Sequence, residues 1–150
     1  MTSLRLFLLC ALVGCASETK APDDLVAARE QFSETLHGSY RFTWRRSCEC
    51  SQESTALIRI TVQNGQIIQA LNVETEQAVS AEVLSSLKTI EGVFDMVEDA
   101  YNEDAASIHI TYDPTQHFPA SVSIDYDLNV ADEEFSLQIT DVSSFDADGT

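Results

Sequence analysis

Basic residues are scarce in this 150-residue sequence. It has 8 lysines and arginines against 25 aspartates and glutamates, which gives a formal net charge of −17 at pH 7. Nucleic-acid binding depends on cationic side chains that displace counterions from phosphates, so this composition argues strongly against DNA or RNA as a partner. It disfavours anionic lipid surfaces too. A surface of this charge favours solubility as a solvated acidic coat, or binding of metal cations or a basic partner protein.

Long hydrophobic runs are also absent. The most apolar segment, Leu6 to Val13, is much shorter than the roughly 20 residues that a membrane-spanning helix needs. It follows Arg5 and precedes Gly14, so the order is a positive start, a short apolar core and a small residue at a cleavage site. This order is typical of a secretory signal and argues against a stable transmembrane anchor.

The end of this segment carries a more specific motif. Leu12-Val13-Gly14-Cys15 resembles the lipobox of bacterial lipoproteins, in which signal peptidase II cleaves before a diacylglycerol-modified cysteine. The resemblance implies a signal peptide over residues 1–14 and a protein anchored to a membrane of the cell envelope through lipid on Cys15, facing the periplasm or the exterior. Cleavage there leaves 7 basic against 25 acidic residues, a net charge of −18. An ordinary signal peptide with a chance cysteine is the alternative.

The rest of the chain is long enough to bury one hydrophobic core, and we expect a single domain over residues 23–142. Residues 15–22 lack apolar periodicity and are expected to form a lipidated tether. Residues 143–150 are expected to form a flexible tail.

Apolar periodicity predicts two helices and six strands. The first helix covers about residues 23–37 and stops at Gly38, and the second follows the N-cap Ser80 and runs to about Tyr101. Strands are expected near residues 40–46, 56–63, 66–74, 106–112, 119–128 and 133–142.

Asn64-Gly65 lies between the second and third strands and is the strongest short-range signal for a hairpin. The order helix-βββ-helix-βββ, with short turns, predicts an α+β fold in which consecutive strands pair antiparallel. We expect both amphipathic helices to pack on one face of the sheet; the pattern leaves open whether there is one sheet or two.

Cysteine is sparse, and only Cys48 and Cys50 remain once Cys10 is cleaved off and Cys15 is acylated. Outside the cytoplasm two thiols this close are expected to form a disulfide, provided that the chain bends between them. The alternative is a thiol-disulfide redox protein, because the arginine pair just before them would lower the pKa of a thiol. Against this, the chain has no Cys-x-x-Cys at a helix start and no βαβ pattern.

A second candidate site is acidic and would hold a cation. Asp125, Asp127 and Asn129 have the spacing that opens an EF-hand calcium loop, and Asp132 follows. The match fails at Val130, which occupies the glycine position, and the flanks have strand patterns. Strand alternation also explains these aspartates as residues on the solvent face before a turn. They are weak metal candidates, and we expect no cofactor.

Several motifs recur together in one known pattern: Tyr40-x-Phe42, Cys48-x-Cys50, Asn64-Gly65, Tyr112-Asp113, Phe118-Pro119, Ile124-Asp125 and Asp132-Glu133-Glu134. In these the chain resembles a family of bacterial secreted proteins and lipoproteins known only as a domain of unknown function. The resemblance covers about residues 37–142, and His117 stands where that pattern has glycine.

The resemblance implies an envelope location and a fold, and it implies no activity. We therefore expect a non-enzymatic envelope lipoprotein that acts as a binding or interaction module for a protein or small molecule. The alternatives are a redox protein that uses Cys48 and Cys50, and a calcium-binding envelope protein.

Overall fold

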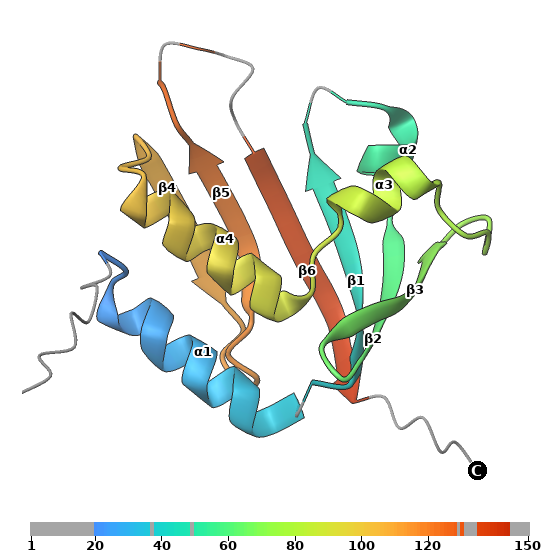
Figure 1. Cartoon of the computed structure of the whole chain (residues 1–150), viewed down its shortest axis with the longest axis horizontal. Helices are drawn as coiled ribbons and strands as arrows, with labels where there is room; N and C mark the ends of the chain where they lie inside the picture. Colours follow the sequence, from blue (N-terminus) through green and yellow to red (C-terminus); the bar gives the residue numbers. More distant parts are fainter. Residues whose placement is uncertain (1–19, 37, 49, 129, 131–134, 145–150) are drawn as a thin grey trace, which may run out of the picture.

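Six antiparallel strands form one sheet in the order β3-β2-β1-β6-β5-β4 (Figure 1). The computed structural model describes residues 20–144 except 37, 49, 129 and 131–134. The strands are β1 (Tyr40–Ser47), β2 (Ile58–Gln63), β3 (Gln66–Asn72), β4 (Ser107–Tyr112), β5 (Pro119–Asp125) and β6 (Phe135–Ser144). The predicted α+β class is confirmed, and the open alternative is decided in favour of one sheet, because β1 pairs with β6 and joins the two halves.

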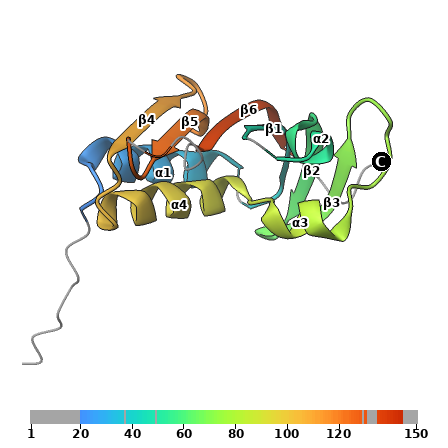
Figure 2. The same cartoon turned by 90° about the horizontal axis from the view of Figure 1, so that it is seen from above.

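The helices are α1 (Asp23–Leu36), the short α2 (Gln52–Thr55), α3 (Ala81–Ser86) and α4 (Ile90–Asn102). All but α2 lie along one face of the sheet (Figure 2). Figure 2 shows α1, α3 and α4 on the same side of the sheet, whereas α2 lies past the end of β1 (Figure 1). We call the side opposite α1, α3 and α4 the helix-free face. None of the described helices is long and apolar enough to cross a bilayer.

The core fills the space between helices and sheet. Side chains alternate along a strand, so Tyr40, Phe42 and Trp44 of β1 all point to the helix side, and all three are buried. The ring of Tyr40 meets Phe32 of α1 edge to face, with the centroids 5.6 Å apart. Leu25 of α1 belongs to the same core, so the apolar face of this helix begins in its first turn, directly after Pro22.

The hydroxyl of Tyr40 ties β1 to the start of α4. It accepts a hydrogen bond from the backbone N–H of Ile90 at 2.9 Å and donates one to the carboxylate of Glu91. Burial, and then the hydrogen bond to Glu91, raise the pKa of Tyr40 well above its ordinary value of 10.0. Ionisation of Tyr40 therefore opposes this packing.

We expect the protein to lose stability in alkali through Tyr40. Its contribution is complete below pH 10, where unfolded tyrosine is also protonated, and it falls as the pH rises from 10 toward the higher folded pKa, by about 1.4 kcal/mol per pH unit. Urea unfolding at pH 9, 10 and 11 measures the slope. Tyr40→Phe should reduce the slope without abolishing it, because burial also raises the pKa of Tyr112, to about 12. An unchanged slope in Tyr40→Phe would contradict this assignment.

The predicted helix from Ser80 to Tyr101 is wrong in its middle, where the chain forms α3 and α4 instead. Leu87 has extended backbone angles (φ −74°, ψ 152°) and ends α3, and the Thr89 side chain accepts a hydrogen bond from the N–H of Gly92 at 3.1 Å. Thr89 is therefore a second N-cap. The continuous apolar period concealed this break, and Leu84, one of the residues of that period, is exposed.

Other boundaries also differ from the predictions. Strand β5 ends at Asp125, so Tyr126 and Leu128 are exposed and do not extend its apolar face. Strand β6 continues to Ser144, into the predicted tail, because Tyr40 of β1 provides a pairing partner for that residue. The one-turn helix α2 was not predicted.

Candidate functional site: the helix-free face of the sheet

The sheet face opposite the helices is polar. The strand registers align its outward side chains in rows across the sheet. One row is Gln69, Thr61, Arg41 and Ser143; a second is Leu71, Arg59, Thr43 and Thr140; a third is Arg45, Gln138, Ser121 and Thr111; a fourth is Ser47, Ser136, Ser123 and His109. Hydroxyl, amide and guanidinium groups dominate these rows, so the face offers hydrogen bonds over a broad area.

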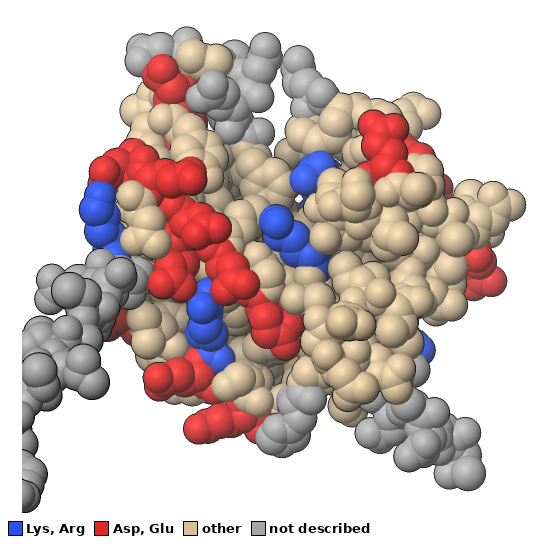
Figure 3. Space-filling view, in the orientation of Figure 1, with Lys and Arg blue, Asp and Glu red and all other residues tan. Residues whose placement is uncertain are grey.

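Acidic residues gather on the other side of the molecule. Figure 3 views the helix side, where aspartate and glutamate side chains cover much of the surface over α1 and α4. On the described outward strand positions of the helix-free face, acids occur only at the margins, as Asp125 at the end of β5 and Asp141 beside a bulge in β6. The two faces of the sheet therefore differ in two ways: helices cover one of them, and the acidic residues gather on that same side.

Three arginines lie together on the helix-free face, and we call Arg41, Arg45 and Arg59 the arginine cluster. Arg41 and Arg45 lie four residues apart on β1, about 13 Å at the usual rise of a strand. Arg59 of β2 pairs with Thr43, midway between them. The chain has only 8 basic residues, so this is a strong local concentration of positive charge.

The three arginines of the cluster differ in their contacts and in their exposure. Arg41 donates from Nε to the hydroxyl of Thr61 at 3.3 Å and helps to bury that threonine, which is 2% exposed. Arg45 is exposed and Arg59 half-buried, and neither forms an ion pair with any residue that the structure describes. Two guanidinium groups thus keep their donors available for an outside acceptor.

A shallow hollow of about 330 Å³ lies beside Arg45. Its lining is Arg45, Ser47, Ser136, Leu137 and Gln138, from the adjacent strands β1 and β6. Hydroxyl and amide groups therefore surround one member of the arginine cluster.

Cys48 and Cys50 lie at bends directly after β1. Their sulfur atoms are in direct contact, and the Cα atoms are 5.4 Å apart, within the range of about 4.4–6.8 Å that disulfides use. Cys48 is half-buried and Cys50 is exposed. The chain bends at both cysteines, as a disulfide between two residues this close in the sequence requires.

The arginine pair before these cysteines is divided between the two faces. Arg45 belongs to the helix-free face, whereas Arg46 lies over the ring of Phe135, 5.2 Å from its centroid. Burial lowers the pKa of Arg46. Because alternation separates the two cations, they do not act on the cysteines as a pair.

The calcium candidates are only partly covered by the structure. The carboxylate of Asp125 accepts a hydrogen bond from the backbone N–H of Asp127 at 3.0 Å, which is a local turn interaction. Asn129 and Asp132 lie outside the described residues, as does Cys15. Within the described part of the chain, no three acidic, histidine or cysteine side chains come together as metal ligands.

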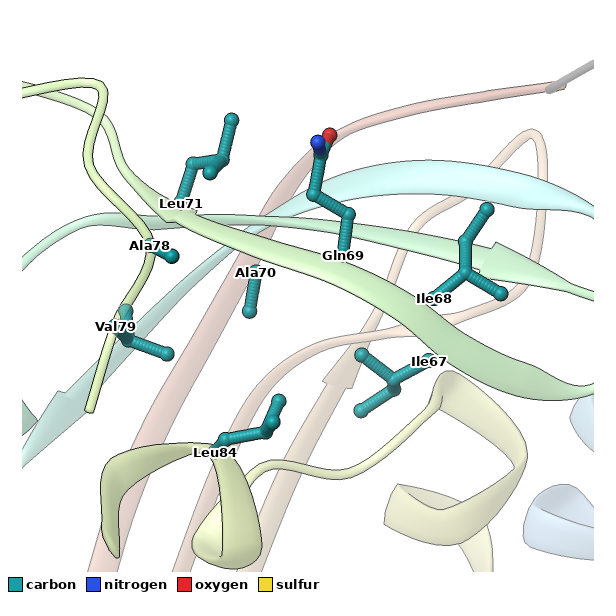
Figure 4. A pocket seen from close by; sticks show the side chains of 8 residues that line it. All are labelled: Ile67, Ile68, Gln69, Ala70, Leu71, Ala78, Val79 and Leu84. Atoms are coloured by element: carbon teal, nitrogen blue, oxygen red, sulfur yellow. The ribbon is translucent and has the colours of Figure 1, made fainter. Parts of the chain in front are cut away.

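An apolar groove of about 240 Å³ runs beside the edge strand β3 (Figure 4). Ile67, Ala70 and Leu84 point toward one another in it, while Gln69 and Leu71 point to the other side of the strand. Ala78 pairs with Leu71 by an isolated bridge, so the chain itself already covers one end of the edge. Neither the groove nor the arginine cluster was predicted as a site from the sequence.

A family model matches residues 24–144, from the start of α1 to the end of β6. The chain belongs to DUF6174, a family of unknown function. This confirms the resemblance to a domain of unknown function and extends it over α1. No curated protein and no solved structure matches the chain. The DUF6174 domain thus comprises the whole sheet, including both strands of the arginine cluster.

Proposed function

We propose that this DUF6174 protein is a lipid-anchored, non-enzymatic binding module of the bacterial cell envelope, which holds its partner on the helix-free face. The observation that carries the proposal is that face itself: a broad polar surface with two arginines unpaired among the described residues, in a strongly acidic chain. A broad array of donors and acceptors suits recognition of another surface.

The start of the described chain supports an orientation for the anchored domain. The backbone N–H of Lys20 donates to the side chain of Asn102 at 3.1 Å, and its ammonium group donates to Asp104 at 2.7 Å. Lys20 is thus held at the turn between α4 and β4. The span from Cys15 to Lys20 reaches at most about 17 Å, so the β4 edge would lie nearest the membrane.

The arginine cluster then lies on the part of the sheet away from the anchor. In the strand order, β1 and β2 are three and four positions from β4, or about 14 to 19 Å at the usual strand spacing. A lipid on Cys15 would therefore present the cluster to the surrounding compartment.

Intact mass of the membrane-extracted protein, before and after reduction and alkylation, tests the proposal. We expect an acylated N-terminus at Cys15, with residues 1–14 removed, and two alkylation events that require prior reduction. These results would establish the anchor and a Cys48–Cys50 disulfide. A mature chain with an unmodified N-terminus would contradict the anchor.

A thiol-disulfide redox protein is the second candidate, favoured by the exposure of Cys50 at a bend beside Cys48. An accessible sulfur is what exchange with an external thiol requires. In this case two reactive thiols would be alkylated in folded, exported protein without reduction. Fully oxidised cysteines that resist mild reductant would exclude it.

A further inference from the structure

We infer that the partner binds through a short acidic segment of a protein, whose carboxylates pair with Arg45 and Arg59 on the helix-free face. This inference rests on the proposed function and specifies the chemistry of the partner. Guanidinium groups bind carboxylates through two parallel hydrogen bonds, which provide both energy and orientation.

Charge complementarity selects this occupant. Arg45 and Arg59 have no carboxylate partner among the described residues, and Arg45 is exposed. The neighbouring outward positions carry Thr43, Gln138 and Ser47, which are uncharged. A carboxylate that reaches Arg45 therefore meets donors among uncharged neighbours, while Asp141, the acid beside the bulge in β6, accepts a hydrogen bond from the hydroxyl of Thr140 at 3.0 Å.

The dimensions fit a few residues of extended chain. Arg59 pairs with Thr43, two residues before Arg45, so the two arginines lie on neighbouring strands about 7 Å apart along the strand direction. Alternate residues of an extended peptide point to the same side about 7 Å apart, so two acidic side chains could reach Arg45 and Arg59 together. Hydroxyl and amide groups around the hollow beside Arg45 can bind its backbone.

The rest of the molecule disfavours larger anions. With 25 acidic residues in the chain, a long polyanion or an anionic bilayer would meet like charge once it extended beyond the cluster. A short segment avoids this repulsion, because charges beyond the screening length of about 8 Å interact weakly at physiological salt. The proposed tether also places the cluster away from the anchoring membrane.

Fluorescence anisotropy of the full lipoprotein in neutral detergent micelles tests the inference. The probe is a labelled 12-residue peptide in which aspartate and glutamate alternate with serine, and its counterpart has asparagine and glutamine instead. We expect the acidic peptide to bind and its affinity to fall at high salt, while the neutral peptide does not bind.

Substitutions then locate the site. Arg45→Gln or Arg59→Gln should each weaken the acidic peptide about threefold, and the double variant about tenfold, as expected for partly exposed ion pairs. Lys88→Gln is the matched control, because it removes one exposed positive charge from the junction of α3 and α4 and should leave binding unchanged. Unchanged circular dichroism would show that the variants fold.

Equal binding by the wild type and the double variant would overturn the inference, as would an equal loss in Lys88→Gln, which indicates a general charge effect. Stronger binding to phosphatidylglycerol vesicles than to the peptide would assign the face to lipid instead. If the protein is acylated but does not bind the peptide, this inference fails and the proposed anchor stands. If the protein binds the peptide but is not acylated, the proposed anchor fails and this inference stands.

Discussion

Replacing Phe94 with alanine should lower the free energy of unfolding by about 3–5 kcal/mol, the usual cost of removing a fully buried aromatic ring. Phe94 has no exposed surface and lies where α1, α4 and β4 meet. Its ring contacts Phe32 and stacks on Tyr112, with centroids 6.0 and 6.5 Å apart, and the guanidinium of Arg29 lies over it. The alanine variant would leave a cavity between α1, α4 and β4, and these packed elements cannot all move inward to fill it.

Urea unfolding measures the effect, and Val26→Ala is a suitable control. Val26 also lies on a helix but is exposed, so its truncation should change stability by no more than about 0.5 kcal/mol. The total stability of a domain is only about 5–15 kcal/mol, so Phe94→Ala should also shift the thermal midpoint by many degrees. If both variants unfolded alike, the junction would not be the packing centre that its contacts indicate.

The local elements of this fold were predictable where one strong signal controlled them. Asn64 and Gly65 have φ of 51° and 73°, the left-handed values that a two-residue hairpin turn requires, and β2 and β3 pair as predicted. Gly38, the predicted helix stop, has φ of 73°. His117, where the resemblance led us to expect glycine, also has a positive φ of 61°, so the backbone conformation is left-handed at a residue other than glycine.

The break between α3 and α4 was not predictable from periodicity, because apolar residues continue through it at helical spacing. The capping interaction of Thr89 with Gly92 competes with a continuous helix, and the contacts of Tyr40 with Ile90 fix where the second helix begins. Those contacts join residues 50 positions apart. A local pattern contains no information about them.

The arginine cluster could be recognised only in part. Alternation places Arg59 on the solvent face of its strand, but the strand order is needed to bring it beside Arg41 and Arg45. The same alternation explains why Arg45 and Arg46, neighbours in the sequence, lie on opposite faces. The cysteine contact was easier to predict, since two residues separated by one position need only a local bend.

Replacing Cys15 with serine should abolish incorporation of labelled palmitate and leave an unprocessed chain that retains residues 1–14. A serine hydroxyl cannot form the thioether to diacylglycerol, and the resemblance to a lipobox implies that signal peptidase II requires this modification before it cleaves. Metabolic labelling and intact mass measure the two effects. The expected change in labelling is complete, because one sulfur atom carries the attachment.

Cys10→Ser is the matched control, because it removes a thiol from the same segment without altering the lipobox. It should retain both labelling and cleavage. If Cys15→Ser were still cleaved and the wild type were unlabelled, the segment would be an ordinary signal peptide. The DUF6174 domain would then be released unanchored, and the arginine cluster would no longer be oriented by a membrane, although its capacity to bind carboxylates would be unchanged.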